Sequence, residues 1–156
     1  MSFPVFDILA SRADLGPDRV AFEDIAGGEQ VNYLELHHRA GKATALLADL
    51  GVAQGECVAL LCRNRIEFFE LLFACARLGA ILVPLNWRMP GQELTPLLED
   101  CGAQWLFYGA EDAGVAAGLA GNHLLRINLD DSSESGYPRR RDALQAQAGR
   151  DQWPAN

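Results

Sequence analysis

The sequence predicts an α/β fold: an open, mostly parallel sheet with helices on both faces, together with a short hairpin near the N-terminus. Strand patterns at 57–62, 80–83, 105–108 and 123–129 alternate with helical patterns, as in right-handed βαβ units. The first of these runs is apolar at every position, as a strand covered on both faces must be. With 156 residues, 49% of them hydrophobic, the chain is long enough for one domain with its own core.

The chain begins with a predicted helix and a predicted hairpin. Apolar residues recur at helical spacing from Pro4 to Leu15, and Gly16 and Pro17 end that pattern. Two short strands follow, over 20–25 and 30–33, and the glycines between them allow a tight turn. We therefore expect a helix and then a hairpin in this part of the chain.

The two longest helical patterns each begin at an asparagine. Asn32 is predicted to cap the first of them, with Glu35 reaching back to the cap amide, and Gly51 ends it. Asn64 and Glu67 repeat this arrangement before the second helix.

The second of these helices, over 65–78, is ended by Gly79 and has too many apolar residues for a single stripe. We expect it to be buried on two sides.

The remaining elements complete the alternation, and the chain then becomes polar. They are a strand, a helix, a strand, a helix and a strand, over 80–83, 92–101, 105–108, 112–119 and 123–129. Pro84 is expected to close the first of these strands. From Asp130 onward no periodic core signal is present. We therefore predict an α/β subdomain over 1–129 and a polar linker over 130–156.

Charge and hydropathy exclude several classes of partner. Thirteen Lys and Arg against 21 Asp and Glu give a net charge of −8, which argues against a nucleic-acid binder. The first residues lack the pattern of a secretory signal. The most apolar stretch, 68–85, is interrupted by Glu70 and Arg77 and is too broken to span a bilayer as one helix. A cytoplasmic location is therefore expected.

Spacing alone indicates no catalytic or metal-binding residue. The four cysteines form no C-x-x-C pair, and the single lysine, Lys42, is in no phosphate-binding motif. Asp130 and Asp131 follow a predicted strand and suggest a magnesium or phospho-acceptor site, but a solvated loop explains them more simply. The arginines at 139–141 have two similar interpretations, an anion contact or a solvated segment.

Four segments in order do resemble a known family. They are Val31–Leu36, Leu50–Leu60, Arg63–Phe68 and Arg77–Arg88, similar to T-Y-x-E-L, L-G-V-x-x-G-D-x-V-A-I, N-x-x-E-F/W and K-x-G-A-x-x-V-P-L-N-x-R. These patterns are those of the N-terminal region of the adenylate-forming superfamily of acyl-CoA synthetases, peptide adenylation domains and luciferases. Each is weak alone, but together they are specific across residues 1–130. The last segment most resembles fatty acyl-CoA and related carboxylate–CoA ligases.

The resemblance implies a part of a larger ligase. The family's Ser/Thr/Gly-rich phosphate loop, its adenine- and acyl-binding segments and its C-terminal domain with the catalytic lysine are not found in these residues. We expect an N-terminal fragment that is inactive alone and holds no cofactor, whose parent uses ATP, magnesium and CoA to activate a small-molecule carboxylate. Its partners would be the remainder of that parent and, through the apolar helix over 65–78, a second copy of itself. The alternative is a stand-alone binding or assembly module with the same fold.

The resemblance also implies a role for one residue, Arg88. In similar ligases the arginine of the Asn-x-Arg motif approaches the phosphorylated nucleotide end of CoA, and a guanidinium suits phosphate because it donates in a bidentate fork. The simpler alternative is that Arg88 caps the third helix or pairs with Glu93 on the surface. The acyl substrate, and the choice between CoA and a carrier protein as acceptor, stay open.

Overall fold

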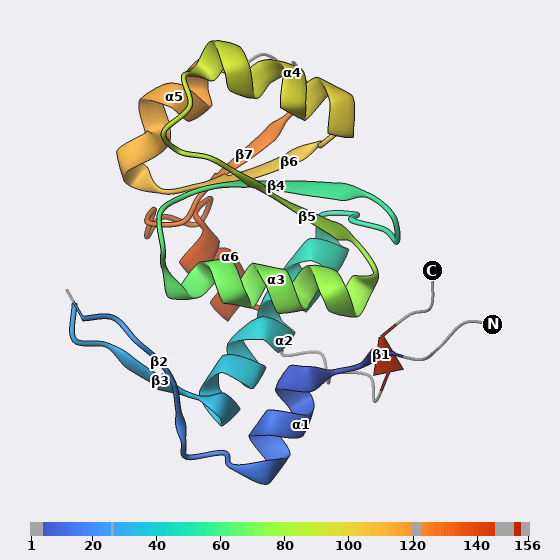
Figure 1. Cartoon of the computed structure of the whole chain (residues 1–156), viewed down its shortest axis with the longest axis vertical. Helices are drawn as coiled ribbons and strands as arrows, with labels where there is room; N and C mark the ends of the chain where they lie inside the picture. The colour runs from blue at the N-terminus through green and yellow to red at the C-terminus, as the bar shows by residue number, and fades with distance from the viewer. Residues whose placement is uncertain (1–4, 26, 120–122, 146–151, 154–156) are drawn as a thin grey trace.

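A four-stranded parallel sheet forms the centre of the molecule (Figure 1). The computed structural model describes residues 5–25, 27–119, 123–145 and 152–153, with the backbone alone described at 5–6 and 152–153. The strand order is β5-β4-β6-β7, and every neighbouring pair is parallel. The four strands are β4 Cys57–Leu61, β5 Ile81–Leu85, β6 Trp105–Tyr108 and β7 Leu125–Asn128.

Helices cover both faces of this sheet, which confirms the predicted fold class (Figure 1). One face packs against α2 (Tyr33–Asp49), α3 (Ile66–Leu78) and α6 (Tyr137–Asp142). The other packs against α4 (Gly91–Cys101) and α5 (Ala113–Gly118), which a short 3-10 helix over Ala110–Asp112 precedes.

Strand β4 serves both cores because its side chains alternate across the sheet. Val58 and Leu60 are buried among the α2 and α3 side chains, and Ala59 and Leu61 among those of α4 and α5. Burial on both faces of the sheet explains why the sequence of β4 is apolar at every position.

The hairpin and the two-sided burial of α3 are also as predicted. Strands β2 (Val20–Glu23) and β3 (Gln30–Asn32) pair antiparallel outside the main sheet. Leu71 of α3 faces the sheet core, whereas Ile66 of α3 joins a separate cluster with residues of the hairpin, of α1 (Ile8–Leu15) and of α2.

The first helix begins later than the sequence pattern indicated. Asp7 fixes its start, because Oδ1 of Asp7 accepts a hydrogen bond from the amide of Ala10 at 3.0 Å. The residues just before it, Val5–Phe6, are strand β1, which pairs antiparallel with β8 (Gln152–Trp153). Pro4, the predicted first residue of the helix, lies outside the described residues.

One of the two predicted helix caps is correct. Oδ1 of Asn32 accepts from the amide of Glu35 at 2.8 Å, but the Glu35 carboxylate binds Arg39 instead of reaching back. The cap predicted at Asn64 is wrong. Arg65 occupies the cap position of α3 and makes no side-chain cap bond, because a guanidinium has only donors and cannot accept from the first-turn amides.

Proline does not end strand β5 as expected. Pro84 lies inside the strand, opposite Leu60 of β4. A proline lacks the N–H of a ladder bond and is tolerated here because β5 is an edge strand. Gly79 ends α3 as predicted and adopts φ +72°, a left-handed conformation that favours glycine.

The segment predicted to be a polar linker is in part packed against the domain. Tyr137 of α6 is fully buried, and the preceding Gly136 lies so close to the carbonyl oxygen of Asp131 that no side chain would fit. A six-residue helix with one buried residue leaves no periodic pattern to detect. Part of the segment therefore packs on the domain, and the division into a subdomain over 1–129 and a linker over 130–156 toward a phosphate-loop region stays a prediction. None of the described helices is long and apolar enough to cross a bilayer.

Candidate functional site

The carboxyl ends of the parallel strands are the natural place for a site in this fold. The chain leaves β4 toward α3 on one face and leaves β6 toward α5 on the other. Where neighbouring strands connect to opposite faces, the loops separate and leave a crevice in which open α/β sheets bind ligands. The residues that follow β4, β5, β6 and β7 therefore define the candidate site.

Two arginines and one tryptophan lie together at this edge. The guanidinium carbon of Arg88 is 4.1 Å from the centroid of the Trp87 ring, and that of Arg63, which follows β4, is 4.5 Å from it. Such contacts are cation–π interactions, which orient a guanidinium without neutralising it. Arg63 also pairs with Glu111 at 3.6 Å. No ion pair joins Arg88 to a residue that the structure describes, so the cluster presents one such charge and one loosely paired charge to solvent.

Arg88 lies where the sequence placed it, but its partner differs from the surface alternative. Its side chain is exposed, and the ring of Trp87, not Glu93, is its described contact. Its amide donates to Oδ1 of Asn86 at 3.0 Å, which shapes the turn after β5. Arg63 was not singled out from the sequence, because only the fold brings the residues after β4 and β5 together.

A second arginine after β4 is fully engaged. Arg65 forms a bidentate pair with Asp130, Nη1 to Oδ2 at 3.0 Å and Nη2 to Oδ1 at 2.8 Å, and its Nε donates to Glu67. The amide of Ala110 also donates to Asp130. Hydrogen bonding to Arg65 is the main reason that the pKa of Asp130 lies below its ordinary value. Asp130 thus connects the end of β7 to Ala110, which follows β6, and to Arg65, at the start of α3.

The aspartate pair lies in an exposed loop after β7, in agreement with the simpler of its two sequence interpretations. Asp130 is ion-paired, and Asp131 accepts hydrogen bonds from Ser133 and Ser135 within its own turn. Among the described residues no group of three or more His, Cys, Asp and Glu could hold a metal ion. Asp130 and Asp131 therefore have structural contacts and form no metal site with their described neighbours.

A groove of about 680 Å³ lies beside this ion pair, between the hairpin and the start of α3. Its lining is predominantly acidic: Glu23, Asp24, Glu29, Glu67 and Asp130 outnumber the one arginine, Arg65. Repulsion from these carboxylates disfavours a phosphate in this groove. An anion would therefore be bound more favourably near Arg63 and Arg88.

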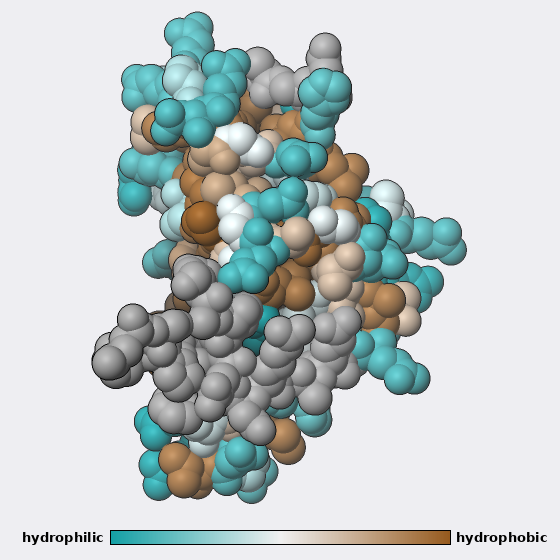
Figure 2. Space-filling model, turned by 90° about the vertical axis from the view of Figure 1, so that its right-hand side faces the viewer, coloured by the Kyte–Doolittle hydropathy of each residue, from teal (hydrophilic) through white to brown (hydrophobic). Residues whose placement is uncertain are grey.

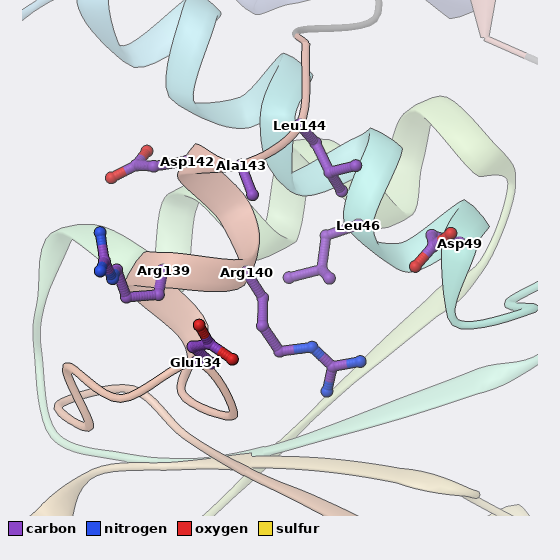
Figure 3. A pocket seen from close by; sticks show the side chains of 8 residues that line it. All are labelled: Leu46, Asp49, Glu134, Arg139, Arg140, Asp142, Ala143 and Leu144. Carbon is purple, nitrogen blue, oxygen red and sulfur yellow. The ribbon is translucent and has the colours of Figure 1, made fainter.

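The 139–141 arginines have separate roles. A groove of about 570 Å³ between α2 and α6 is lined by Leu46, Asp49, Glu134, Arg139, Arg140, Asp142, Ala143 and Leu144. Figure 3 shows Arg140 extending into it near Leu46. Arg141 instead binds the buried carboxylate of Glu70, at 2.8 and 3.0 Å. Only Arg139 and Arg140 line this opening, and carboxylates line it with them.

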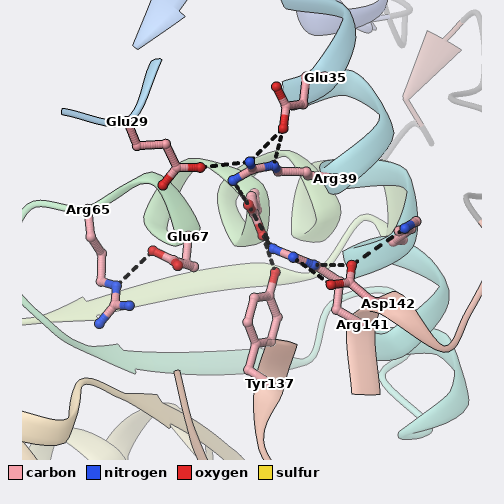
Figure 4. Close-up of polar contacts among 10 residues, drawn as sticks. Glu29, Glu35, Arg39, Arg65, Glu67, Tyr137, Arg141 and Asp142 are labelled. Atoms are coloured by element: carbon pink, nitrogen blue, oxygen red, sulfur yellow. Dashed lines mark hydrogen bonds and ion pairs between the residues drawn. The ribbon is translucent and has the colours of Figure 1, made fainter. Parts of the chain in front are cut away.

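A buried polar network, which the sequence pattern did not reveal, joins α6 to α3 and α2 (Figure 4). Glu70 of α3 is fully buried, and its Oε2 accepts from the hydroxyl of Tyr137 at 2.6 Å as well as from Arg141. Arg39 of α2 lies 3.8 Å from Glu70 and pairs with Glu35 on its outer side. The available signal was a glutamate in the middle of a largely apolar helix.

A second buried pair anchors the N-terminal helix. Nε of Arg77 donates to Oδ2 of Asp7 at 2.8 Å, and both side chains are almost inaccessible. Nη2 of Arg77 lies 3.0 Å from Nδ1 of His37. Burial and the Arg77 charge lower the pKa of His37. These contacts are structural, because they lie on the α1, α2 and α3 side, away from the strand ends.

The chain belongs to the AMP-binding enzyme family, whose model matches residues 9–152. Feruloyl-CoA synthase from an Amycolatopsis species is 39% identical over 116 residues, which are 74% of this chain and 23% of that protein. The long-chain-fatty-acid–CoA ligase FadD13 of Mycobacterium tuberculosis is 34% identical over 108 residues, 69% of this chain and 22% of that protein. The chain thus spans less than a quarter of the length of these curated relatives.

Solved structures agree with the family. The inhibitor-bound crystal structure of the N-terminal domain of FACL13 from Mycobacterium tuberculosis superposes with a TM-score of 0.83 at 26% identity, covering 94% of this chain and 37% of that one. A long-chain-fatty-acid CoA ligase from Rhodopseudomonas palustris, whose assignment is provisional, gives 0.76 at 30% identity, covering 86% and 35%. The match extends beyond residue 129, because the family model includes the α6 segment.

Proposed function

We propose that this chain is the N-terminal part of an AMP-forming carboxylate–CoA ligase. The observation that supports it best is the match of one family model to residues 9–152, together with relatives that are carboxylate–CoA ligases. The larger enzyme would join a carboxylate to ATP as an acyl-adenylate, release pyrophosphate and pass the acyl group to the thiol of CoA. A fatty or aromatic acid is the proposed substrate class, and a cytoplasmic location belongs to the same proposal.

Residues 1–156 alone are proposed to be inactive. The charge of ATP phosphates is met in such sites by backbone amides, lysine and magnesium together. The described residues form no such set, and their one lysine, Lys42, pairs with Asp142. We therefore assign no magnesium ligand to the described residues of this chain. Their proposed contribution to the larger enzyme is the sheet edge that carries Arg63, Trp87 and Arg88.

Carboxylate-dependent exchange of pyrophosphate into ATP tests the proposal. The product of the complete reading frame that contains codons 1–156 should catalyse the exchange and form acyl-CoA, whereas the 1–156 chain should match a no-protein control. Exchange by the pure 1–156 chain would refute its role as an inactive part. A complete product without exchange, or a reading frame that ends at Asn156, would favour the binding or assembly module instead.

Arg88 is proposed to contact a phosphate of CoA. Its exposed guanidinium at the sheet edge, held against Trp87 near Arg63, supports this role. In the larger enzyme, Arg88→Ala should raise KM for CoA by about tenfold, the scale of one charge-assisted hydrogen bond, and leave adenylate formation unchanged. Arg19→Ala, at an exposed arginine on the connection before β2, is the control. Equal loss in both half-reactions would assign Arg88 to folding.

We also propose that apolar surface of this chain is covered by the rest of the larger enzyme or, without it, by a second copy. Figure 2 shows hydrophobic side chains interspersed with hydrophilic ones on the face that it draws. The large hydrophobic residues that are exposed are Ile8, Leu15, Val20, Ile25, Leu34, Leu72, Ile81, Leu97 and Leu125. Sedimentation of the 1–156 chain should show concentration-dependent association. A single monomeric species at high concentration would contradict this.

A further inference from the structure

Two of the four cysteines lie next to each other at the amino end of the sheet. Cys57 is the first residue of β4, and Cys101 is the last residue of α4. In the parallel sheet Val58 of β4 lies beside Trp105 of β6, so Cys57, just before Val58, lies beside Gln104. Gln104 follows Cys101 by three positions in the sequence. The fold thus brings the end of α4 to the start of β4.

The turn after α4 completes this approach. Gly102 adopts φ +63°, and the amide of Ala103 bonds back to the carbonyl of Leu98, which reverses the chain toward β6. The Sγ of Cys101 lies 3.5 Å from the same carbonyl oxygen.

Side chains alternate along β4, so Cys57 lies on the same face as Ala59 and Leu61, the face that packs against α4. The Cys57 thiol interacts there with the thiol of Cys101. Both thiols are free.

The two other cysteines have different surroundings. Cys75 is buried in the core beside α2, and burial raises the pKa of its thiol to about 12. Cys62 lies at the opposite end of β4, and burial raises the pKa of its thiol to about 11. Cys57 and Cys101 are both half-buried and so remain partly accessible to a small reagent. Cys62 is half-buried as well, and burial also raises the pKa of the Cys57 thiol, so mutual contact and not accessibility singles out this pair.

The pair is remote from the candidate site. The 11 residues of α4 separate Cys101 from the connection that carries Trp87 and Arg88, a length of about 16 Å at 1.5 Å per residue. A reaction at these thiols would therefore not consume a group of that site.

We propose that Cys57 and Cys101 form a redox modification site, which a low-molecular-weight disulfide such as oxidised glutathione converts to a reversible intramolecular disulfide. One thiolate attacks the glutathione disulfide, forms a mixed disulfide and releases one glutathione thiolate, which takes up a proton. The second protein thiol loses its proton, attacks the mixed disulfide and releases the second glutathione. Two protein thiols are oxidised, and one disulfide reagent is reduced to two thiols.

The new bond would join α4 to the sheet and close the loop from residue 57 to residue 101. That loop contains α3, β5 and α4, so its closure restricts the unfolded chain. We expect the oxidised chain to melt at least about 5 °C higher than the reduced chain, with the difference abolished by dithiothreitol.

The test uses the folded chain and oxidised glutathione at about pH 8. After unreacted thiols are blocked, the intact mass should show one internal disulfide and two blocked cysteines out of four, and peptide mapping should join Cys57 to Cys101. Cys57→Ser should stop at a mixed disulfide on Cys101. The control variant Cys62→Ser should form the internal disulfide as the parent does.

Three outcomes would overturn the proposal. They are four reactive thiols after oxidation, a disulfide that includes Cys62 or Cys75, and a disulfide that joins two chains instead of closing within one.

Discussion

The two faces of the central sheet are stabilised by different interactions. On the side of α2, α3 and α6, Glu70 and Arg77 are buried, and each pairs with a residue from a distant segment, Arg141 and Asp7 respectively. On the side of α4 and α5, the described core is a cluster of apolar side chains, with Arg126 of β7 at its border donating to the backbone carbonyls of Ala116, Leu119 and Leu124 and forming no buried ion pair there. A buried ion pair adds little net stability, yet breaking it is costly because a charge is left without a partner. On the polar side, that of α2, α3 and α6, the ion pairs therefore fix the positions of α1 and α6. The stability of the apolar side, that of α4 and α5, depends instead on how completely its apolar side chains fill the core.

Loss of Arg77 should have the largest effect on the polar side. Arg77→Met leaves the carboxylate of Asp7 buried without its cation, and the free energy of unfolding should fall by about 3–5 kcal/mol. Urea titration measures this. Asp7→Asn removes the charge but keeps a residue that caps helices well. The double variant should therefore recover a large part of the loss, and simple additivity of the two single losses would show that the pair is not coupled.

Truncation of a core leucine should have the largest effect on the apolar side. Leu94 of α4 is fully buried, and Leu94→Ala should cost about 3 kcal/mol through lost burial and the cavity left behind. Leu97 is on the same helix but is 44% exposed, so Leu97→Ala should cost less than about 1 kcal/mol. Similar losses at both positions in thermal unfolding would contradict the assignment of the buried face of α4.

The two faces also differ in how much of them the sequence predicted. The apolar face was predicted nearly in full, because burial of a helix or strand leaves a periodic pattern that local residues carry by themselves. Strand β6 was predicted at its observed bounds, and α4 to within one residue. The polar contacts of the other face were not predicted, because they join residues far apart in the sequence, 40 positions for His37 and Arg77 and 71 for Glu70 and Arg141.

In the candidate site, too, the feature with a local sequence motif was predicted and the contact between distant residues was not. Arg88 was proposed from a local motif, and the structure does place it at the carboxyl edge of the sheet. Arg63 lies 24 positions earlier than Trp87 in the sequence, and no spacing rule links the two. Asn64 illustrates the reverse error, since the local pattern predicted a cap there, whereas the helix begins one residue later, with Arg65 at the cap position and bonded to Glu67 and Asp130.

The contact of α6 with the polar face should be weaker than the Arg77 pair. Tyr137→Phe removes the hydroxyl that donates to Glu70, while Arg141 continues to neutralise that carboxylate. We expect a loss of about 1–2 kcal/mol in the free energy of unfolding, the scale of one hydrogen bond to a charged group. Tyr108→Phe is the control, because the hydroxyl of Tyr108 bonds to none of the described residues. If Tyr108→Phe lowered the free energy of unfolding as much as Tyr137→Phe does, the hydrogen bond to Glu70 would not be the cause of the loss.

The smallest expected effect on the polar face is a pH dependence at His37. Burial, and then the charge of Arg77, lower the pKa of His37 below its ordinary 6.5. Between the lowered pKa and 6.5 the unfolded chain therefore binds more protons than the folded chain. The stabilising contribution is complete above pH 6.5 and is lost as the pH falls through the folded-state pKa. Protonation would also remove the lone pair of Nδ1 that faces Nη2 of Arg77 at 3.0 Å.

His37→Gln should flatten this part of the stability profile. Urea titrations at about pH 7.5 and about pH 5.5 should show a smaller acid-side loss for the variant than for the parent chain. The difference should stay below that of Tyr137→Phe, because His37 is only half-buried and solvent screens its charge. His38→Gln, at the exposed neighbouring histidine on the same helix, is the matched control. If His37→Gln and the parent chain lost the same stability on acidification, the ring of His37 would not sense Arg77, and the polar face would depend on its ion pairs alone.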